Sequence, residues 1–214
     1  MAIIIAVDGP SGAGKGTVSR GLANKLGFHY LDSGALYRLL GLAAQRHRVA
    51  LDNDQALSVL AAHMDIDFKT LDDGSLKILL ESEDVSQELR TENTGAMASQ
   101  VAAHPEVRAA LFDRQRHFAK APGLIADGRD MGTVVFPEAP LKIYLTASIE
   151  ERAQRRYKEL LDKGENVSLR ALEEQVRSRD ERDMNRDASP LLPAEDAIEL
   201  DTSELSIQEV MDTV

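Results

Sequence analysis

The sequence predicts an α/β fold in three layers, with a central parallel five-stranded sheet between two layers of helices. Short runs rich in Ile, Val and Leu alternate with longer segments whose apolar residues recur at helical spacing. A glycine-rich loop joins the first of these runs to the first helix. The length of 214 residues, with 43% hydrophobic and 29% charged residues, suits one globular domain.

The expected strands are short apolar runs: Ile3–Val7, Phe28–Leu31, Leu124–Ala126, Leu141–Leu145 and Ile198–Leu200. The expected helices are Lys15–Leu26, Ala35–Arg46, Gln55–His63, Glu92–Ala103, Pro105–Ala119, Ile149–Lys163 and Leu169–Met184, with a last one beginning near Ser206. Ligands of parallel sheets bind at the carboxyl ends of the strands. We therefore expect the glycine loop, Asp32–Gly34 and Asp127–Asp130 to gather on one rim.

Residues 65–89 break this alternation. Apolar residues alternate with polar ones on either side of an expected turn at Leu71–Gly74; they are Ile66 and Phe68 before it and Leu76, Ile78 and Leu80 after it. The pattern predicts a β-hairpin, continued by a short strand near Val85. We interpret this segment as a small β-containing insertion on the substrate side.

The polar link Asp162–Asn166 is the second break, and it joins two arginine-rich helices. It suits either the tip of a mobile lid or a plain helix–helix turn, and the link alone does not decide between them.

The glycine loop is the most informative motif. Its residues Gly9, Pro10, Ser11, Gly12, Ala13, Gly14, Lys15, Gly16 and Thr17 have the spacing G-x4-G-K. With a strand before it and a helix after it, this spacing predicts a phosphate-binding P-loop, because glycines let several backbone N–H groups face one anion. We expect Lys15 to reach the outer phosphates of a nucleotide.

Gly16 stands where a hydroxyl commonly follows the lysine, and Thr17 comes one residue later. We therefore expect Mg2+ to be held mostly by phosphates and water, with no direct protein ligand and with Thr17 or Asp127 as the candidate contacts. Asp127 begins the segment Asp127-Gly128-Arg129-Asp130, which follows an apolar strand. It suits an acidic residue facing Mg2+ or a simple Asp-Gly turn, and the nearby P-loop favours the first.

The last long helix carries an apolar stripe at Leu169, Leu172 and Val176, which continues in the same steps to Arg179, Asp183 and Arg186. This ionic end either emerges into solvent or forms an anion site. The preceding helix adds Arg152, Arg155 and Arg156, and Ser148 with Glu151 fits a capping box at its start. Two neighbouring helices rich in arginine favour a phosphate clamp.

The arginines also bear on the reaction. A hydroxyl acceptor benefits from a positioned base, for which the chain offers few candidates, whereas a phosphate monoester is already mostly a dianion at neutral pH. The arginine surplus therefore suits phosphorylation of a nucleoside monophosphate. Two alternatives stay open: another P-loop small-molecule kinase acting on a hydroxyl, and a nucleotide-binding switch protein.

The composition limits the kinds of partner that the protein is expected to bind. Lys+Arg 25 against Asp+Glu 36 gives a formal charge of −11, which disfavours a nucleic-acid polymer. The sequence has no cysteine, no stretch near the roughly 20 apolar residues of a membrane span, and no basic segment at its start. We expect a cytoplasmic monomer that binds small nucleotides and no membrane.

These motifs together resemble a known family. Gly9–Thr17 is similar to the P-loop of nucleoside monophosphate kinases, and Leu31–Arg38, Ile125–Thr133 and Arg179–Arg186 resemble bacterial cytidylate kinases. The resemblance runs nearly end to end and includes the hairpin. It implies a transferase of pyrimidine nucleotide metabolism that uses ATP and Mg2+ to convert CMP and dCMP to CDP and dCDP.

The resemblance also implies an organisation and a site. It implies one P-loop kinase domain over residues 1–214, with a monophosphate-binding region at 33–110 that includes the insertion and a lid at 152–168. Cytosine recognition is implied for Ser33, Ser99, Arg108 and Asp130, a grip on the CMP phosphate for Arg38 and Arg129, and a place in the same substrate set for Tyr37. Arg179, Asp183 and Arg186 resemble a group near the acceptor sugar and the transferring phosphate, and Lys15 and Arg156 resemble ATP contacts. Lys15, Arg129, Arg179 and Arg186 are thus the expected catalytic residues.

Overall fold

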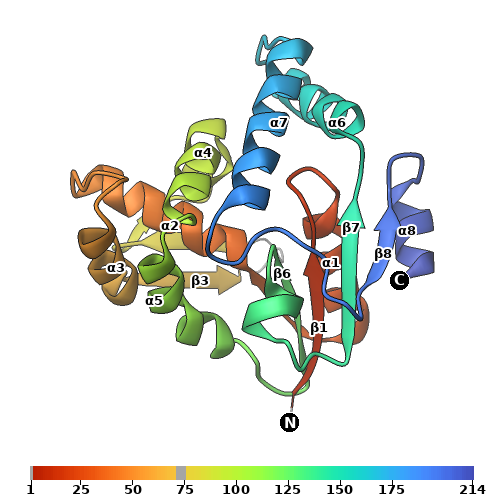
Figure 1. Cartoon of the computed structure of the whole chain (residues 1–214), viewed down its shortest axis with the longest axis horizontal. Helices are drawn as coiled ribbons and strands as arrows, with labels where there is room; N and C mark the ends of the chain where they lie inside the picture. Colours follow the sequence, from red (N-terminus) through yellow and green to blue (C-terminus); the bar gives the residue numbers. More distant parts are fainter. Residues whose placement is uncertain (1, 71–75) are drawn as a thin grey trace. The chain divides into compact units, whose positions relative to one another are not determined.

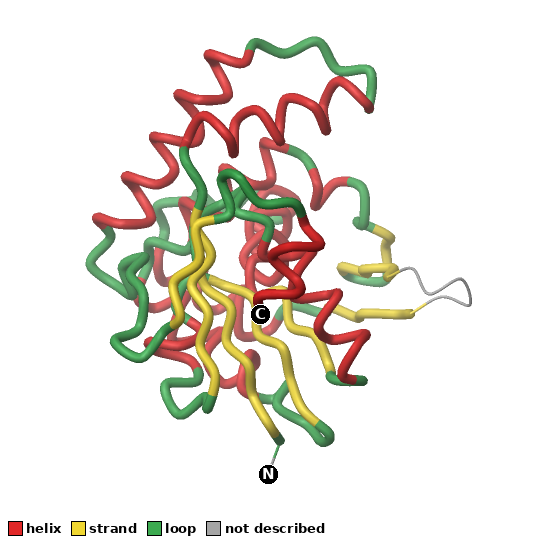
Figure 2. The backbone as a smooth tube through the Cα atoms, turned by 90° about the vertical axis from the view of Figure 1, so that its right-hand side faces the viewer, coloured by secondary structure: helices red, strands yellow, loops and turns green. Residues whose placement is uncertain are grey.

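The computed structural model describes residues 2–70 and 76–214, and its central feature is a five-stranded parallel sheet (Figure 1). The strands are β1 (Ile3–Asp8), β2 (His29–Asp32), β6 (Gly123–Gly128), β7 (Leu141–Thr146) and β8 (Ile198–Asp201). Their order is β2-β6-β1-β7-β8, and all four pairings are parallel. Figure 2 shows these strands side by side.

The sheet belongs to a unit formed by the residues up to Asp32 and from Gln115 onward. Its helices are α1 (Lys15–Leu26), α6 (Ile149–Asp162), α7 (Leu169–Asn185) and α8 (Ile207–Thr213). Buried apolar side chains of β1, β6 and β7 pack with those of α1 and α8, as with Val7, Ile125 and Val18. The predicted α/β class, a central five-stranded parallel sheet flanked by helices, is confirmed.

Helices α6 and α7 form a hairpin with its own small apolar cluster, centred on Ala153, Leu160 and Leu172. The link between them turns at Gly164, whose φ of 78° favours glycine. The amides of Lys163 and Gly164 donate to carbonyls in the last turn of α6. The predicted turn is thus present, and its use as a lid stays a prediction.

Residues Ser33–Arg114 form a second unit. Its helices are α2 (Ser33–Arg46), α3 (Asp54–His63), α4 (Glu92–Val101) and most of α5 (Pro105–Arg116), with a 3-10 turn at Glu88–Arg90. Helix α2 packs closely on α4, where a Cβ added at Gly41 would lie 2.8 Å from Cβ of Met97. Strands β3 (Ile66–Thr70), β4 (Leu76–Leu80) and β5 (Glu83–Asp84) form the predicted antiparallel insertion. The turn predicted at Leu71–Gly74 lies outside the described residues.

The boundaries differ from prediction by a few residues, and one difference matters for function. Strand β6 does not end at Ala126 but continues through Asp127 to Gly128, paired with β1. The interpretation of Asp127 as part of a simple Asp-Gly turn is therefore wrong. A five-residue π-helical turn, Met131–Val135, follows this strand and was not predicted.

Candidate active site

The P-loop joins the carboxyl end of β1 to the start of α1. Gly9 has φ 143°, and a Cβ there would lie 1.9 Å from the carbonyl oxygen of Leu145, so only glycine fits. Gly14 caps α1 with φ 87°, and no side chain among the described residues caps this helix end. The first N–H groups of a helix have no intrahelical acceptor, and they carry its positive dipole end. This loop therefore offers an anion site.

Lys15 is buried in the P-loop at 6% exposure, and its Nζ donates to the carbonyl of Pro10 at 2.8 Å. Burial lowers the pKa of Lys15 from 10.5 to about 7, and Arg129 adds to this effect, whereas Asp127 opposes it. A bound phosphate would favour the charged form of Lys15. The position of this lysine therefore suits the binding of an anion.

Asp127 lies beside the P-loop at the end of β6. It is buried, and its Oδ2 accepts a hydrogen bond from the Tyr30 hydroxyl at 3.2 Å. Burial raises the pKa of Asp127 from 3.8 to about 6, against the effect of Lys15. A Cβ at Gly16 would lie 3.6 Å from the same oxygen. A carboxylate so close to the P-loop backbone is a suitable oxygen ligand for Mg2+, while the other candidate, Thr17, is exposed at the start of α1.

The ionic end of α7 is buried against the loop after β6. Nε of Arg129 donates to Oδ2 of Asp183 at 3.0 Å, and a guanidinium nitrogen of Arg186 lies 4.0 Å from Oδ1. Burial disfavours the charge on Asp183, but Arg129, Arg179 and Arg186 outweigh it and hold the pKa of Asp183 below its usual value. The alternative that placed Asp183 and Arg186 in solvent is therefore wrong.

A second buried ion pair joins α6, α7 and the P-loop. The guanidinium of Arg152 donates to the Asp180 carboxylate at 3.0 and 2.5 Å and to the carbonyl of Ser11 at 3.0 Å. Arg152 is therefore occupied by protein groups, although the sequence grouped it with the clamp. The pairing of Asp180 was not predicted from the sequence. The stripe on this helix face was followed from Val176 to Arg179, a step of three residues, whereas a step of four leads to Asp180. Arg156, predicted to contact ATP, pairs with Glu159 on the surface of α6.

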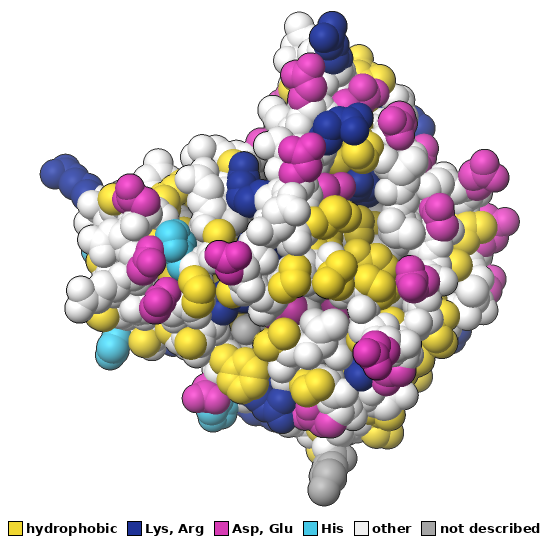
Figure 3. Space-filling view, in the orientation of Figure 1, with side chains coloured by type: hydrophobic (Ala, Val, Ile, Leu, Met, Phe, Trp, Pro, Cys, Tyr) yellow, Lys and Arg dark blue, Asp and Glu magenta, His cyan; other side chains and the backbone are white. Residues whose placement is uncertain are grey.

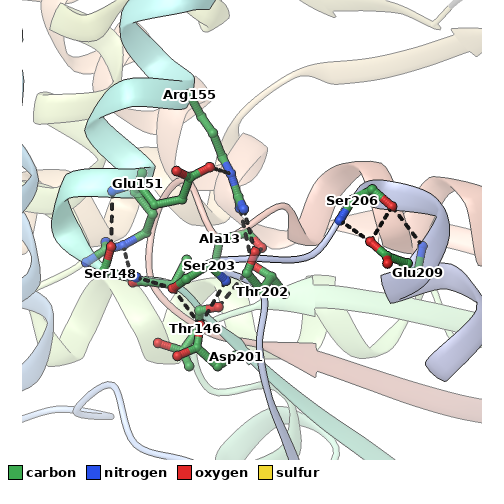
Figure 4. A network of polar contacts seen from close by, with 12 residues as sticks. Ala13, Thr146, Ser148, Glu151, Arg155, Asp201, Thr202, Ser203, Ser206 and Glu209 are labelled. Carbon is green, nitrogen blue, oxygen red and sulfur yellow. Dashed lines mark hydrogen bonds and ion pairs between the residues drawn. The ribbon is translucent and has the colours of Figure 1, made fainter.

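The start of α6 differs from the predicted capping box (Figure 4). Ser148 accepts a hydrogen bond from the amide of Glu151, as predicted, but the Glu151 carboxylate binds Arg155. The amide of Ser148 donates instead to the hydroxyl of Ser203. A tertiary neighbour thus replaces half of the box. A complete capping box occurs at α8, between Ser206 and Glu209.

The same network contacts the backbone of the P-loop through Thr202. The hydroxyl of Thr202 lies 3.3 Å from the carbonyl of Ala13 and 3.0 Å from that of Thr146. Arg155 binds both the hydroxyl and the carbonyl of Thr202 (Figure 4). No pattern in the sequence indicated this role of Thr202.

Asp130 is buried in the first unit, directly before the π-helical turn. The other residues predicted to bind the acceptor nucleotide lie in the second unit. Ser33, Tyr37 and Arg38 are on α2, Ser99 is on α4 and Arg108 is on α5. The guanidinium of Arg108 lies 5.4 Å from the centre of the Tyr37 ring and donates to the carbonyl of Ala102. Arg38 donates to the carbonyl of Leu89 at 2.7 Å. The structure thus brings Tyr37 and Arg108 together.

Figure 3 shows Asp and Glu side chains spread over the face in view, with Lys and Arg side chains scattered among them. This face offers no broad basic surface for a polyanion. None of the helices in the described part of the chain combines the length and the apolar character that crossing a membrane requires.

The parallel sheet, the glycine loop after β1 and the buried Lys15 define the P-loop kinase class. The family model described as cytidylate kinase matches residues 5–214. A cytidylate kinase of Stutzerimonas stutzeri (strain A1501) is 59% identical over 212 residues, covering 99% of this chain and 93% of the relative. One of Pseudomonas aeruginosa (strain LESB58) is 60% identical with the same coverage. The chain belongs to the cytidylate kinase family.

A solved structure shows a similar fold. An uncharacterized protein from Eubacterium ventriosum ATCC 27560 matches with a TM-score of 0.50 at 11% identity, covering 99% of this chain and 94% of that one.

Proposed function

We propose that the protein transfers the γ-phosphoryl group of ATP to CMP, and also to dCMP, giving ADP and CDP or dCDP. The observation that carries the proposal is the buried P-loop lysine with the cluster of Arg129, Asp183 and Arg186 in the same unit. These charges suit a reaction whose main obstacle is repulsion between two phosphorylated molecules.

The transfer needs no general base. A phosphate oxygen of CMP attacks the γ-phosphorus in line, a new P–O bond forms, and the bond to the bridging oxygen of ADP breaks with its electrons. Because the second pKa of a phosphate monoester is about 6, the attacking oxygen carries no proton at neutral pH. We propose that Lys15, Arg129, Arg179 and Arg186 stabilise the charge spread over the transferred group.

On the donor side, the amides of residues 9–17 would hold the ATP phosphates, and Arg156 is proposed as a further contact. The buried carboxylate of Asp127 fits a role toward Mg2+, either directly or through water. Bound Mg2+ would neutralise charge on the phosphates of ATP. Thr17 stays an alternative contact for the ion.

On the acceptor side, we propose that Arg38 and Arg129 bind the CMP phosphate and that Asp130, with Ser33, Ser99 and Arg108, recognises cytosine. Tyr37 and Asp183 complete this set. The ring contact between Tyr37 and Arg108 supports a shared role. Residues 33–110 would form the monophosphate-binding region and residues 152–168 a lid, whose separate apolar cluster supports movement as one body.

Coupled measurement of ADP release tests the proposal. Purified protein with ATP and Mg2+ should turn over CMP and dCMP faster than UMP or AMP and should show no turnover with shikimate. Saturable release only with a hydroxyl substrate would favour the hydroxyl kinase instead. Tight nucleotide binding without any turnover that depends on a monophosphate would favour the nucleotide switch.

We also propose a cytoplasmic monomer that binds no nucleic acid, in line with the formal charge of −11. Analytical ultracentrifugation of the purified protein tests the first point, since a sedimenting dimer would contradict it.

A further inference from the structure

We propose that Asp8 is a positioning residue for the acceptor nucleotide, because its carboxylate holds the backbone that follows Arg129 and Asp130. This inference rests on the proposed function, in which these two residues bind CMP. Asp8 was not among the site residues expected from the sequence.

The geometry is specific. Asp8 is the last residue of β1 and precedes the P-loop directly. Its Oδ1 accepts a hydrogen bond from the amide of Met131 at 2.8 Å, and its Oδ2 accepts one from the amide of Gly132 at 2.7 Å. Both oxygens of one carboxylate thus bind two consecutive amides, and such charge-assisted bonds are among the stronger ones.

The segment needs these acceptors. The chain leaves β6 after Gly128, and Asp130 precedes the π-helical turn with φ −146° and ψ 25°. The amides at the start of a helical turn have no acceptor within it. Met131 and Gly132 are both buried, so their amides require a protein partner. Asp8 supplies it for both.

The contact also leaves little room at Gly132. A Cβ at Gly132 would lie 3.4 Å from Oδ2 of Asp8 and 3.1 Å from Cδ of Lys142. The distance to Asp8 is that of an ordinary close contact, and the distance to Lys142 is short enough that the lysine side chain must shift. The carboxylate and the turn therefore fit together closely, which is what fixing the direction of adjacent side chains demands.

Asp8 connects the two halves of the proposed reaction. It ends the strand that leads into the P-loop. Burial raises the pKa of Asp8 to about 7, and the Asp130 charge adds to this effect, whereas the amides of Gly132 and Met131 and the charge of Lys15 oppose it. Arg129 has a second anchor, because it binds Asp183 at 3.0 Å. Loss of Asp8 should therefore disturb the position of Asp130 more than that of Arg129.

The test is Asp8→Asn, which keeps the shape of the side chain but offers a single acceptor oxygen. We expect the KM for CMP to rise about tenfold, equal to about 1.4 kcal/mol, with the KM for ATP changed less than about twofold. The preference for CMP over UMP should fall, since Asp130 is proposed to recognise cytosine. Steady-state kinetics well below the Tm, with calorimetric binding of CMP, measures these effects.

Ser206→Ala is the matched control. It removes a side-chain oxygen that also accepts from a backbone amide at the start of a helix, that of Glu209 in α8, away from Met131 and Gly132. It should lower the Tm while leaving the KM for CMP within about twofold of the wild-type value. A loss of stability in Asp8→Asn without a change in CMP affinity, or an equal rise in both KM values, would overturn the proposal.

Gly132→Ala keeps the proposal testable if Asp8→Asn does not fold. The added methyl group lies in direct contact with Oδ2 of Asp8 at 3.4 Å, and the flexible Lys142 side chain can move away. We expect a rise of about threefold in the KM for CMP with little change for ATP; no change would count against the proposal. If the wild-type protein forms no CDP, the proposed function fails; if it does and both variants match it, only the role of Asp8 fails.

Discussion

The buried pair of Arg152 and Asp180 allows a direct test of what holds α6, α7 and the P-loop together. The guanidinium is 3% exposed and bonds to the carboxylate at 3.0 and 2.5 Å. In Asp180→Ala this buried charge loses its counterion, which costs about 3–5 kcal/mol. Arg152 keeps its bonds to the carbonyls of Ser11 and Ala147. We therefore expect the lower end of this range, about 3 kcal/mol.

Denaturant unfolding followed by circular dichroism measures this loss, and the corresponding fall in Tm is about 6–12 °C for a chain of this length. Glu174→Ala is the matched control on the same helix, because Glu174 pairs with Arg170 on the exposed surface; it should cost less than about 0.5 kcal/mol. The double variant Arg152→Met/Asp180→Leu should recover most of the stability. Equal destabilisation by Asp180→Ala and Glu174→Ala would refute the reasoning.

Four further outcomes follow from the site. Lys15→Ala should lower kcat about 100-fold or more and change CMP binding little; equal losses would contradict its role. Asp130→Ala should reduce the preference for CMP over UMP in competition kinetics, and an unchanged preference would refute that role. Because burial lowers the pKa of Lys15 to about 7, the lysine is mostly neutral at pH 8, and bound phosphates raise its pKa. When metal-free ADP binds at pH 8, the protein should therefore take up about one proton. Calorimetry in two buffers detects this uptake, and binding without proton uptake would contradict the reasoning. The fully buried Ser19 hydroxyl has no hydrogen-bond partner among the described residues. Ser19→Ala should thus stabilise the protein by about 1 kcal/mol in thermal unfolding, and a loss of stability would be evidence against this account.

The local parts of this protein could be predicted because their causes are local. The G-x4-G-K spacing predicted the loop whose Gly9 and Gly14 have positive φ. Apolar runs predicted the strands of the parallel sheet, and alternation at Ile66 and Phe68 predicted the antiparallel insertion. Ser206 was predicted to start the last helix and does so with a complete capping box. In each case residues a few positions apart decide the backbone conformation.

The sequence by itself thus determined the class of fold, the phosphate-binding loop and the family, because these depend on short-range patterns and on resemblance. Tertiary structure decided the partners of the buried charges. Arg152 binds Asp180, 28 positions away, and Asp8 binds the amide of Gly132, 124 positions away. Likewise, Glu151 turns to Arg155 since Ser203 binds the Ser148 amide. A buried charge takes the nearest partner in space, and only the folded chain sets which residue that is.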